Sequence, residues 1–305
     1  MSEIKPLVAV HCLVYNHAPY LRDCFEGVVM QQTNFPFVAI VHDDASTDGS
    51  AAIICEYEQK YPHIFKPIYQ QENVYRKGGF SAINDIMNTA IEDTGAKYVA
   101  MCEGDDYWTD PLKLQKQVDF MEANPECSMC FHGAEIKNET DTKVITTCQN
   151  IEDKEYFTND IFPGWVVPTA SVVYRRSTIN SFHILKQTHW MKYGDIVLFL
   201  KCTHTGRVWG MKEKMSVYRM TTNGAVVSQC LDPKSEEKVC NHYRFLMMNF
   251  PQLDKKWPSE YIAKYHYTRF RQTKGVLNKL KALCMAFRFS PKIVFQKFAS
   301  TLKRV

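Results

Sequence analysis

Hydrophobic and polar positions alternate in two distinct rhythms along about the first 130 residues. Short apolar runs bounded by polar turns predict buried strands, at 7–14, 37–43, 64–70 and 97–104. Between them, apolar residues recur every three or four positions and predict helices, at 21–29, 49–60, 80–91 and from Pro111 onward. This alternation favours an α/β fold with a mostly parallel sheet flanked by helices.

The middle of the chain is less regular. We expect the polar stretch 137–160 to be rich in loops, 166–176 to form one strand, and 207–220 to form a pair of strands. A helix is predicted over 194–206. Cys127 and Cys130 have a metal-like spacing, but they lie in an apolar run with no second pair downstream, so a buried strand is preferred to a zinc site.

Polar residues gather where the predicted strands end. Ligands of doubly wound sheets bind beyond the carboxyl ends of the strands, and Glu103, Asp105 and Asp106 follow the fourth strand within four positions. Three adjacent anions repel one another unless water, a cation or a donor offsets their charge. A hard divalent cation that bridges to phosphates meets this need, with Gly104 giving a bulky ligand room; a solvated acidic turn is the alternative.

Other residues at the same edge are suited to a nucleotide. Tyr15 could stack on a planar ring, and Arg76 and Lys77 could meet base or phosphate oxygens; a packed tyrosine and a solvated basic loop are the alternatives. Asp43 and Asp44 follow the second strand and could accept hydrogen bonds from a base or sugar. The chain has no P-loop motif and no G-x-G-x-x-G after its first strand, which disfavours P-loop NTPases and dinucleotide dehydrogenases.

Four separated stretches together resemble glycosyltransferase family 2, whose members have the GT-A fold. They are "VAVHCLVYNHAPYLRDCFEGVVMQQT", "VHDDASTDGS", "CEGDDYWTDPLKLQKQ" and "GDIVLFLKC" with "MSVYR", and they occur in the family's order. The resemblance covers roughly residues 5–225. It implies a nucleotide-sugar donor, a divalent metal (Mn²⁺ or Mg²⁺) and inversion at the anomeric carbon.

The resemblance also implies roles for the acids and their neighbours. Leu13 and Tyr15 would line the base pocket, and Asp44 would accept from the base imide with Asp43 in support. Glu103 and Asp105 take the places of the two acids in the D-x-D motif. Both would serve the metal, Asp105 as its main ligand and Glu103 also near ribose or sugar, while Asp106 extends the motif in the nucleotide-sugar site.

Asp195 falls where the family keeps its general base. Inversion needs a carboxylate that takes the proton of the acceptor hydroxyl, and the predicted helix start at Asp195 should keep that carboxylate ionised. From the residues alone, a helix cap is the alternative. Trp165 and Thr169 would lie on the acceptor side, and Trp108 would be either the floor of the sugar site or part of the core.

Two departures from the family's pattern concern the metal. Glu103 replaces the more usual Asp, and Arg219 is followed by Met220 and Thr221, whereas many relatives place a metal-binding histidine at the second of these positions. We therefore expect the metal to be held mainly by Asp105 and the diphosphate. None of the ten histidines has a spacing typical of a ligand, so all are interpreted as structural.

Charge is distributed unevenly. Residues 261–305 contain eleven Lys and Arg residues and no Asp or Glu, although the net charge of the whole chain is only +4, so the remainder is acidic. Apolar residues share helical faces in this tail, at 276–287 and, after Ser290 and Pro291, at 293–302. Such helices can lie on an anionic membrane, and the alternative is a helix docked on the catalytic domain. No nucleic-acid partner is expected, because no reading module is visible.

The sequence thus predicts a GT-A catalytic domain at 1–225 and a helical basic region at 226–305. Eleven cysteines without a secretory signal indicate a cytoplasmic protein, peripheral on the inner membrane face if the tail binds lipid. The predicted activity is transfer of a hexosyl or N-acetylhexosaminyl group from a nucleotide diphosphate sugar, with UDP as the expected nucleotide, to a hydroxyl of a glycan or lipid-linked oligosaccharide, as in surface polysaccharide synthesis. The alternatives are a nucleotide-sugar-binding protein without transferase activity and a nucleotidyltransferase.

Overall fold

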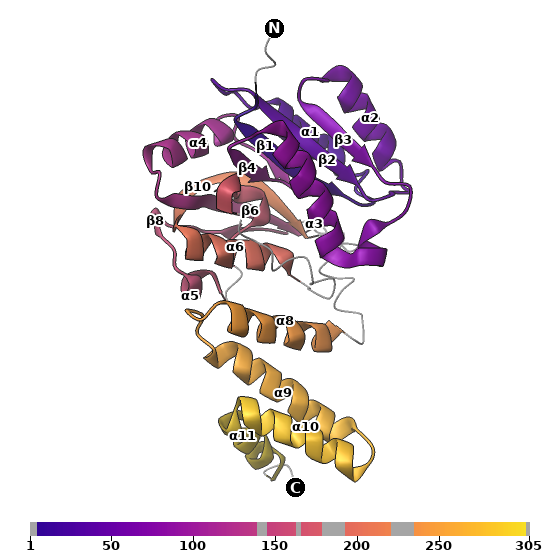
Figure 1. Cartoon of the computed structure of the whole chain (residues 1–305), viewed down its shortest axis with the longest axis vertical. Coiled ribbons are helices and arrows are strands. Elements are labelled where there is room, and N and C mark those ends of the chain that lie inside the picture. The colour runs from indigo at the N-terminus through magenta and orange to yellow at the C-terminus, as the bar shows by residue number, and fades with distance from the viewer. Residues whose placement is uncertain (1–4, 139–144, 163–165, 179–192, 221–234, 303–305) are drawn as a thin grey trace. The chain divides into compact units, whose positions relative to one another are not determined.

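The computed structural model describes residues 5–138, 145–162, 166–178, 193–220 and 235–302 (Figure 1). It divides into two compact units. The first comprises Met1–His189 with Gly194–Val227, and the second comprises Trp190–Tyr193 with Ser228–Val305. Each unit is described by itself.

The first unit is built on one mixed sheet with the strand order β3-β2-β1-β4-β9-β6-β10-β5. Its parallel part consists of four strands, β1 (Val8–Val14), β2 (Phe37–Asp43), β3 (Phe65–Tyr69) and β4 (Tyr98–Met101). These strands end at a common edge, because Val14 pairs with Asp43 and Asp43 pairs with Tyr69. The parallel register therefore places the turns that follow β1 and β2 side by side.

The remaining strands extend the sheet through both parallel and antiparallel pairs. They are β5 (Tyr107–Trp108), β6 (Cys127–Asn138), β7 (Ile145–Gln149), β8 (Lys154–Glu155), β9 (Val173–Arg175) and β10 (Arg207–Met220). β9 runs antiparallel to both β4 and β6, and β10 runs parallel to β6. Through β9 and β6, the sheet carries β10 toward the segment that follows β4.

Helices flank this sheet (Figure 1). They are α1 (Leu21–Val29), α2 (Ser50–Lys60), α3 (Val74–Thr94), α4 (Lys113–Ala123), α5 (Thr158–Ile161) and α6 (Gly194–Thr205). Phe25 of α1 packs against Tyr57 of α2 and Phe65 of β3, with ring centroids 5.1 and 4.9 Å away. Burial of these aromatic side chains fastens α1 and α2 to one face of the parallel strands.

The predicted α/β fold class is confirmed, and the four parallel strands and their helices lie where the apolar rhythm placed them. α3 begins six residues before its apolar register does. Gly79 explains the offset, since its left-handed φ of 64° interrupts the helix just before Phe80. Cys127 and Cys130 lie in the buried part of β6, which confirms the predicted buried strand.

Three predictions for the middle of the chain were wrong. The stretch 137–160 contains β7, whose backbone pairs antiparallel with β6, and the two-residue β8. Residues 166–176 form a 3₁₀ turn (Thr169–Ser171) before the short β9, because the carbonyl of Pro168 accepts from the N–H of Ser171 and closes a turn. Residues 207–220 form one strand, because register shifts within the pairing of β10 with β6 accommodate the exposed polar residues at its centre and no turn is needed there.

The second unit is helical. It contains α8 (Ser235–Asn249), α9 (Lys256–Gln272), α10 (Val276–Phe289) and α11 (Pro291–Leu302). Tyr267, Ala286 and Val294 form a small buried cluster that joins α9, α10 and α11. Across the described part of both units, no helix combines the length and the apolar character that crossing a membrane requires.

Candidate active site

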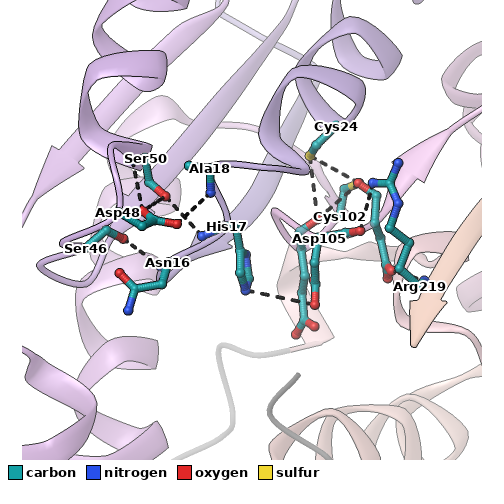
Figure 2. Close-up of polar contacts among 12 residues, drawn as sticks. Asn16, His17, Ala18, Cys24, Ser46, Asp48, Ser50, Cys102, Asp105 and Arg219 are labelled. Atoms are coloured by element: carbon teal, nitrogen blue, oxygen red, sulfur yellow. Dashed lines mark hydrogen bonds and ion pairs between the residues drawn. The ribbon is translucent and has the colours of Figure 1, made fainter. Parts of the chain in front are cut away.

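The turns after β1 and β2 are tied together by hydrogen bonds (Figure 2). Backbone N–H groups of each turn donate to side chains of the other: Asn16 to Ser46 Oγ (2.9 Å), His17 to Ser50 Oγ (3.0 Å), Ala18 to Asp48 Oδ2 (2.9 Å) and Thr47 to Asn16 Oδ1 (2.8 Å). Asn16 has a left-handed φ of 57°, which asparagine tolerates better than most residues. The backbone around Tyr15 and His17 is therefore fixed.

Tyr15 and Arg76, both predicted to bind the nucleotide, lie together. Tyr15 is 37% exposed, and the Arg76 guanidinium donates to its hydroxyl at 3.4 Å. Lys77 instead pairs with Glu72, and both of these side chains are exposed. A flat aromatic ring beside a guanidinium offers a planar base a stacking surface and a hydrogen-bond donor.

Asp43 and Asp44 are buried, and their carboxylates hold backbone in place. Asp44 accepts from the N–H groups of Val74 at 2.6 Å and Tyr75 at 3.1 Å, so it anchors the first turn of α3. Asp43 accepts from Ser46 N–H at 3.3 Å. Each carboxylate oxygen has a second lone pair, so the role of Asp44 toward a base imide stays a prediction.

Gly104 is small for a reason that the sequence did not reveal. A Cβ at this position would lie 2.8 Å from His17 Nδ1 and 3.0 Å from side-chain atoms of Leu21 and Val14. The glycine accommodates the His17 ring and core side chains, and its expected role in leaving room for a bulky ligand stays a prediction. The N–H of Gly104 also donates to the Leu13 carbonyl at 2.9 Å, which ties the acidic residues to β1.

The acidic residues after β4 form a crowded, poorly solvated group. Asp106 is buried, and its Oδ2 has no hydrogen-bond partner among the residues that the structure describes. Burial, reinforced by Asp105, raises the pKa of Asp106 well above its ordinary value. Burial, Asp105 and Asp195 together raise the pKa of Glu103 to about 8. The carboxylates therefore lie close enough to resist one another's ionisation.

Asp195, the predicted general base, lies in the first turn of α6, near enough to Glu103 for its charge to add to the effect of burial in raising the pKa of that carboxyl. Burial raises the pKa of Asp195, and the backbone N–H groups at the helix start offset this only in part. The helix start thus favours the ionised form, as expected, but desolvation is the larger of the two effects on the pKa of Asp195. A raised pKa makes the carboxylate a stronger proton acceptor once it is ionised.

Arg219 of β10 supports the acidic residues and was missed in the sequence as a site residue. Its N–H donates to Asp106 Oδ1 at 2.8 Å, its Nη1 donates to the Asp105 carbonyl at 3.1 Å, and its Nη2 pairs with Asp23. The guanidinium lies 4.4 Å from the ring centroid of Tyr107. The only signal in the sequence was its place in the "MSVYR" stretch, which says nothing about these contacts.

The structure decides between the two interpretations of Trp108. Its ring is buried, its Nε1 donates to the Ala170 carbonyl at 2.8 Å, and the Lys113 ammonium lies 4.2 Å from the ring centroid. Trp108 is therefore a core residue. Thr169 is buried in the 3₁₀ turn beside it, and Trp165 lies outside the described residues.

The donor set fits a hard divalent cation that is shared with a substrate. Among the described residues, no three His, Cys, Asp or Glu side chains are arranged to hold a metal by themselves. Asp105 and Glu103 nevertheless offer carboxylate oxygens in a site with excess negative charge. Magnesium-type sites commonly use one or two carboxylates and take their other ligands from substrate phosphates and water.

Comparison with known families matches residues 10–181 to Glycosyl transferase family 2. The chain belongs to this family. The family predicted from the four sequence stretches is thereby confirmed.

Relatives of this family 2 chain include an uncharacterised protein of Mycobacterium tuberculosis, 33% identical over 226 residues. That match covers 71% of this chain and 60% of the relative, so the chain spans well under the full length of that protein. The putative teichuronic acid biosynthesis glycosyltransferase TuaG of Bacillus subtilis is 27% identical over 224 residues, covering 73% of this chain and 82% of TuaG.

Solved structures with the same fold include residues 1–349 of Staphylococcus aureus TarS in complex with UDP-GlcNAc. The TM-score is 0.62 at 15% identity, over 92% of this chain and 81% of that one. The mannosyltransferase PcManGT of Pyrobaculum calidifontis, in complex with GDP-Man and Mn²⁺, gives a TM-score of 0.56 at 13% identity, over 96% and 88%. At these identities the likeness concerns the fold, and it confirms the GT-A class.

Proposed function

We propose that this family 2 chain is an inverting glycosyltransferase that moves a hexosyl or N-acetylhexosaminyl group from UDP to a hydroxyl of a glycan or lipid-linked oligosaccharide. The observation that carries the proposal is that Asp195, from α6, lies near enough to Glu103, after β4, for its charge to add to the effect of burial in raising the pKa of that carboxyl. Beyond the effect of burial, both acids, with Asp105, also raise the pKa of the Tyr218 hydroxyl. A carboxylate that can accept a proton and two carboxylates that can bind a metal would then serve the same reacting centre. Tyr15 and Arg76 provide a nucleotide corner at the same edge of the sheet.

The residues divide the reaction between them. Tyr15 would stack on the base, and Arg76 would donate to it or to the phosphates. Asp105 and Glu103 would hold a divalent cation, which supplies charge neutralisation for a departing diphosphate when it is bound. Asp195 would take the proton of the acceptor hydroxyl as that oxygen attacks the anomeric carbon from the face opposite the diphosphate, which inverts the configuration.

The nucleotide and pathway rest on the relatives. TarS was solved with UDP-GlcNAc, and TuaG is named for teichuronic acid biosynthesis, which together favour a UDP-sugar and a surface polysaccharide. PcManGT was solved with GDP-Man and Mn²⁺, so a donor panel needs guanine as well as uracil nucleotides.

The substitution Asp195→Asn tests the assignment of the base. Removing a general base should lower turnover on the preferred donor about 10²- to 10⁴-fold, while UDP binding is retained. Asp119→Asn is a matched control, because Asp119 is an exposed acid on α4 that accepts a hydrogen bond from Gln115. Unchanged turnover in Asp195→Asn would reject the base. A folded wild-type protein that binds donors but neither hydrolyses nor transfers any of them would favour the binding-only alternative.

We further propose that the second unit associates with anionic membrane through α10 and α11. Val276, Leu277, Leu280 and Phe295 are exposed by 76, 66, 51 and 64%. Lys279, Lys281 and Lys292 lie on the same two helices, and 261–305 contains no acid. Exposed apolar side chains among lysines are what a helix needs to lie at an anionic lipid surface.

A further inference from the structure

His17 belongs to the turn after β1, and its side chain faces the acidic residues after β4 (Figure 2). Its N–H donates to Ser50 Oγ at 3.0 Å, and its carbonyl accepts from the N–H groups of Tyr20 at 2.8 Å and Leu21 at 3.0 Å. The backbone of this residue is thus held on both sides. These backbone hydrogen bonds fix the Cα from which the imidazole side chain extends.

The imidazole points at Asp105. Its Nε2 lies 3.9 Å from Asp105 Oδ2, and the two side chains are only 22 and 17% exposed. This separation is too long for a hydrogen bond. On its other side, the ring packs against Gly104, where a Cβ would come within 2.8 Å of Nδ1. His17 Nε2 and Asp105 Oδ2 therefore face one another without a hydrogen bond between them.

A single cation fits this separation. Two ligand atoms bound at about 2.1 Å to one metal stand about 3 Å apart at a right angle and about 4.2 Å apart when opposite. The observed 3.9 Å lies within that range. A nitrogen and a carboxylate oxygen leave further coordination positions for phosphate oxygens and water.

The surrounding charge also calls for a cation here. Glu103 and Asp106 lie close to Asp105, and, beyond the effect of burial, the charge of Asp105 raises the pKa of both carboxyls. The Arg219 guanidinium, which reaches the same residues, is engaged by Asp23 and by the Asp105 carbonyl rather than by the Asp105 carboxylate. A positive charge in front of Asp105 Oδ2 would offset this repulsion.

We propose that His17 Nε2 and Asp105 Oδ2 are the two protein ligands of one divalent cation, whose other ligands are diphosphate oxygens of the donor and water. This inference rests on the proposed function for the diphosphate. It differs from our interpretation of the sequence, in which every histidine is structural. Because Mg²⁺ dehydrates reluctantly and demands near-ideal geometry of oxygen ligands, an imidazole ligand should favour Mn²⁺ over Mg²⁺, even though Mn²⁺ binds nitrogen the most weakly of the first-row transition ions.

Pulsed electron paramagnetic resonance of bound Mn²⁺ tests the proposal directly, because it detects a nitrogen nucleus bonded to the metal. The probes are Mn²⁺ alone and Mn²⁺ with UDP or GDP, on the full chain with ordinary or ¹⁵N-labelled histidine. We expect a ¹⁴N modulation that becomes a ¹⁵N modulation on labelling and disappears in His17→Gln. His63→Gln, which changes an exposed histidine between α2 and β3, should keep it.

Affinity gives a second readout. His17→Gln should weaken Mn²⁺ binding by at least about 10- to 100-fold, because loss of a group that merely hydrogen-bonds to a metal ligand already costs that much, and it should reduce the preference for Mn²⁺ over Mg²⁺. Gly104→Ala should weaken the nitrogen signal, because the added methyl group forces the ring to move. If His17→Gln does not fold, the isotope comparison on the wild-type protein still decides.

The outcomes separate this inference from the proposed function. Bound Mn²⁺ without nitrogen coupling would overturn the histidine ligand, and so would sugar transfer that persists in a chelator without any bound Mn²⁺; in both cases a transferase could stand. A labelled nitrogen signal in a protein that transfers no sugar would support the metal site and reject the transferase.

Discussion

At the scale of single residues, two buried cations explain much about the first unit. Arg219 and Lys113 are both almost fully buried. Arg219 lies beside the acidic residues after β4, and Lys113 lies beside the buried Trp108. They differ in their partners. Arg219 reaches a carboxylate, whereas the partners of Lys113 within the described part of the chain are the Gln117 amide oxygen, at 2.7 Å, and the Trp108 ring.

Replacing Arg219 with Met should destabilise the protein by about 2 to 4 kcal/mol, because buried charge-assisted hydrogen bonds are lost together. Arg22→Met is the matched control. Arg22 forms a pair with Glu56 in which both side chains are about half exposed and screened by water, so its loss should destabilise the protein much less. Urea unfolding of both variants measures the difference. Equal losses would contradict the supporting role of Arg219.

Lys113 should make stability depend on pH. Burial lowers its pKa to about 7 in the folded protein, whereas an unfolded lysine titrates near about 10.4. Between these values the unfolded chain binds a proton that the folded chain does not, so stability should rise with pH from about 7 to about 10.

Lys113→Met removes this titration. The wild-type protein should gain up to about 1.4 kcal/mol per pH unit relative to the variant across that window. Lys116→Met, at a partly exposed lysine paired with Asp110 and Glu213, should keep the wild-type slope. Parallel curves for the wild-type protein and Lys113→Met would show that Lys113 stays protonated in the fold.

At the scale of secondary-structure elements, the site depends on turns that act as one body. Asp48 is central to this body, because its carboxylate accepts from Ala18 N–H, Ser50 N–H and the Ser50 hydroxyl. Ser50 in turn accepts from His17 N–H. The position of the residues after β1 thus relies on a side chain at the start of α2.

Asp48→Ala should lower stability by about 1 to 2 kcal/mol, since it leaves helix-start and turn N–H groups without their acceptor. It should also raise the KM for the donor more than it lowers kcat, because Tyr15 and His17 lose their fixed backbone. Thr47→Ala is the control, since the hydrogen bond from Thr47 N–H to Asn16 survives that change. Donor kinetics and urea unfolding check both points, and an unaltered KM would show that the two turns are independent.

At the scale of the whole molecule, the second unit separates its apolar residues into two groups. Leu283 and Phe287 pack against the buried cluster of Tyr267, Ala286 and Val294. Val276, Leu277 and Leu280, toward the start of α10, stay exposed. The predicted apolar face of α10 is therefore packed near the end of the helix and exposed to solvent near its start.

The double change Leu277→Glu and Leu280→Glu should abolish binding to vesicles rich in phosphatidylglycerol, because it removes apolar insertion and reverses local charge. Met248→Glu is the control, since Met248 is 76% exposed on α8, away from the basic segment. Wild-type binding should weaken as salt rises. Vesicle sedimentation measures all three. A wild-type protein that ignores anionic vesicles, or a double variant that binds as well as the control, would refute membrane docking.

The sequence by itself determined the elements whose pattern is local. The four parallel strands and the helices between them follow from apolar spacing, and the register of parallel strands then brings Tyr15, Asp43 and Asp105 toward one edge. The acids themselves could be recognised because three carboxylates in four positions need compensation whatever the fold.

Only the tertiary structure decided which side chains meet across long stretches of chain. Arg219 reaches Asp105 and Asp106 over more than a hundred positions, and His17 meets Gly104 and Asp105 across two strands. Long-range contacts also place the Asp44 carboxylate at the start of α3 and the Trp108 ring in the core. Such contacts depend on strand order, on register and on the space that a missing Cβ leaves. None of these is encoded in the few neighbouring residues from which a periodic pattern is read.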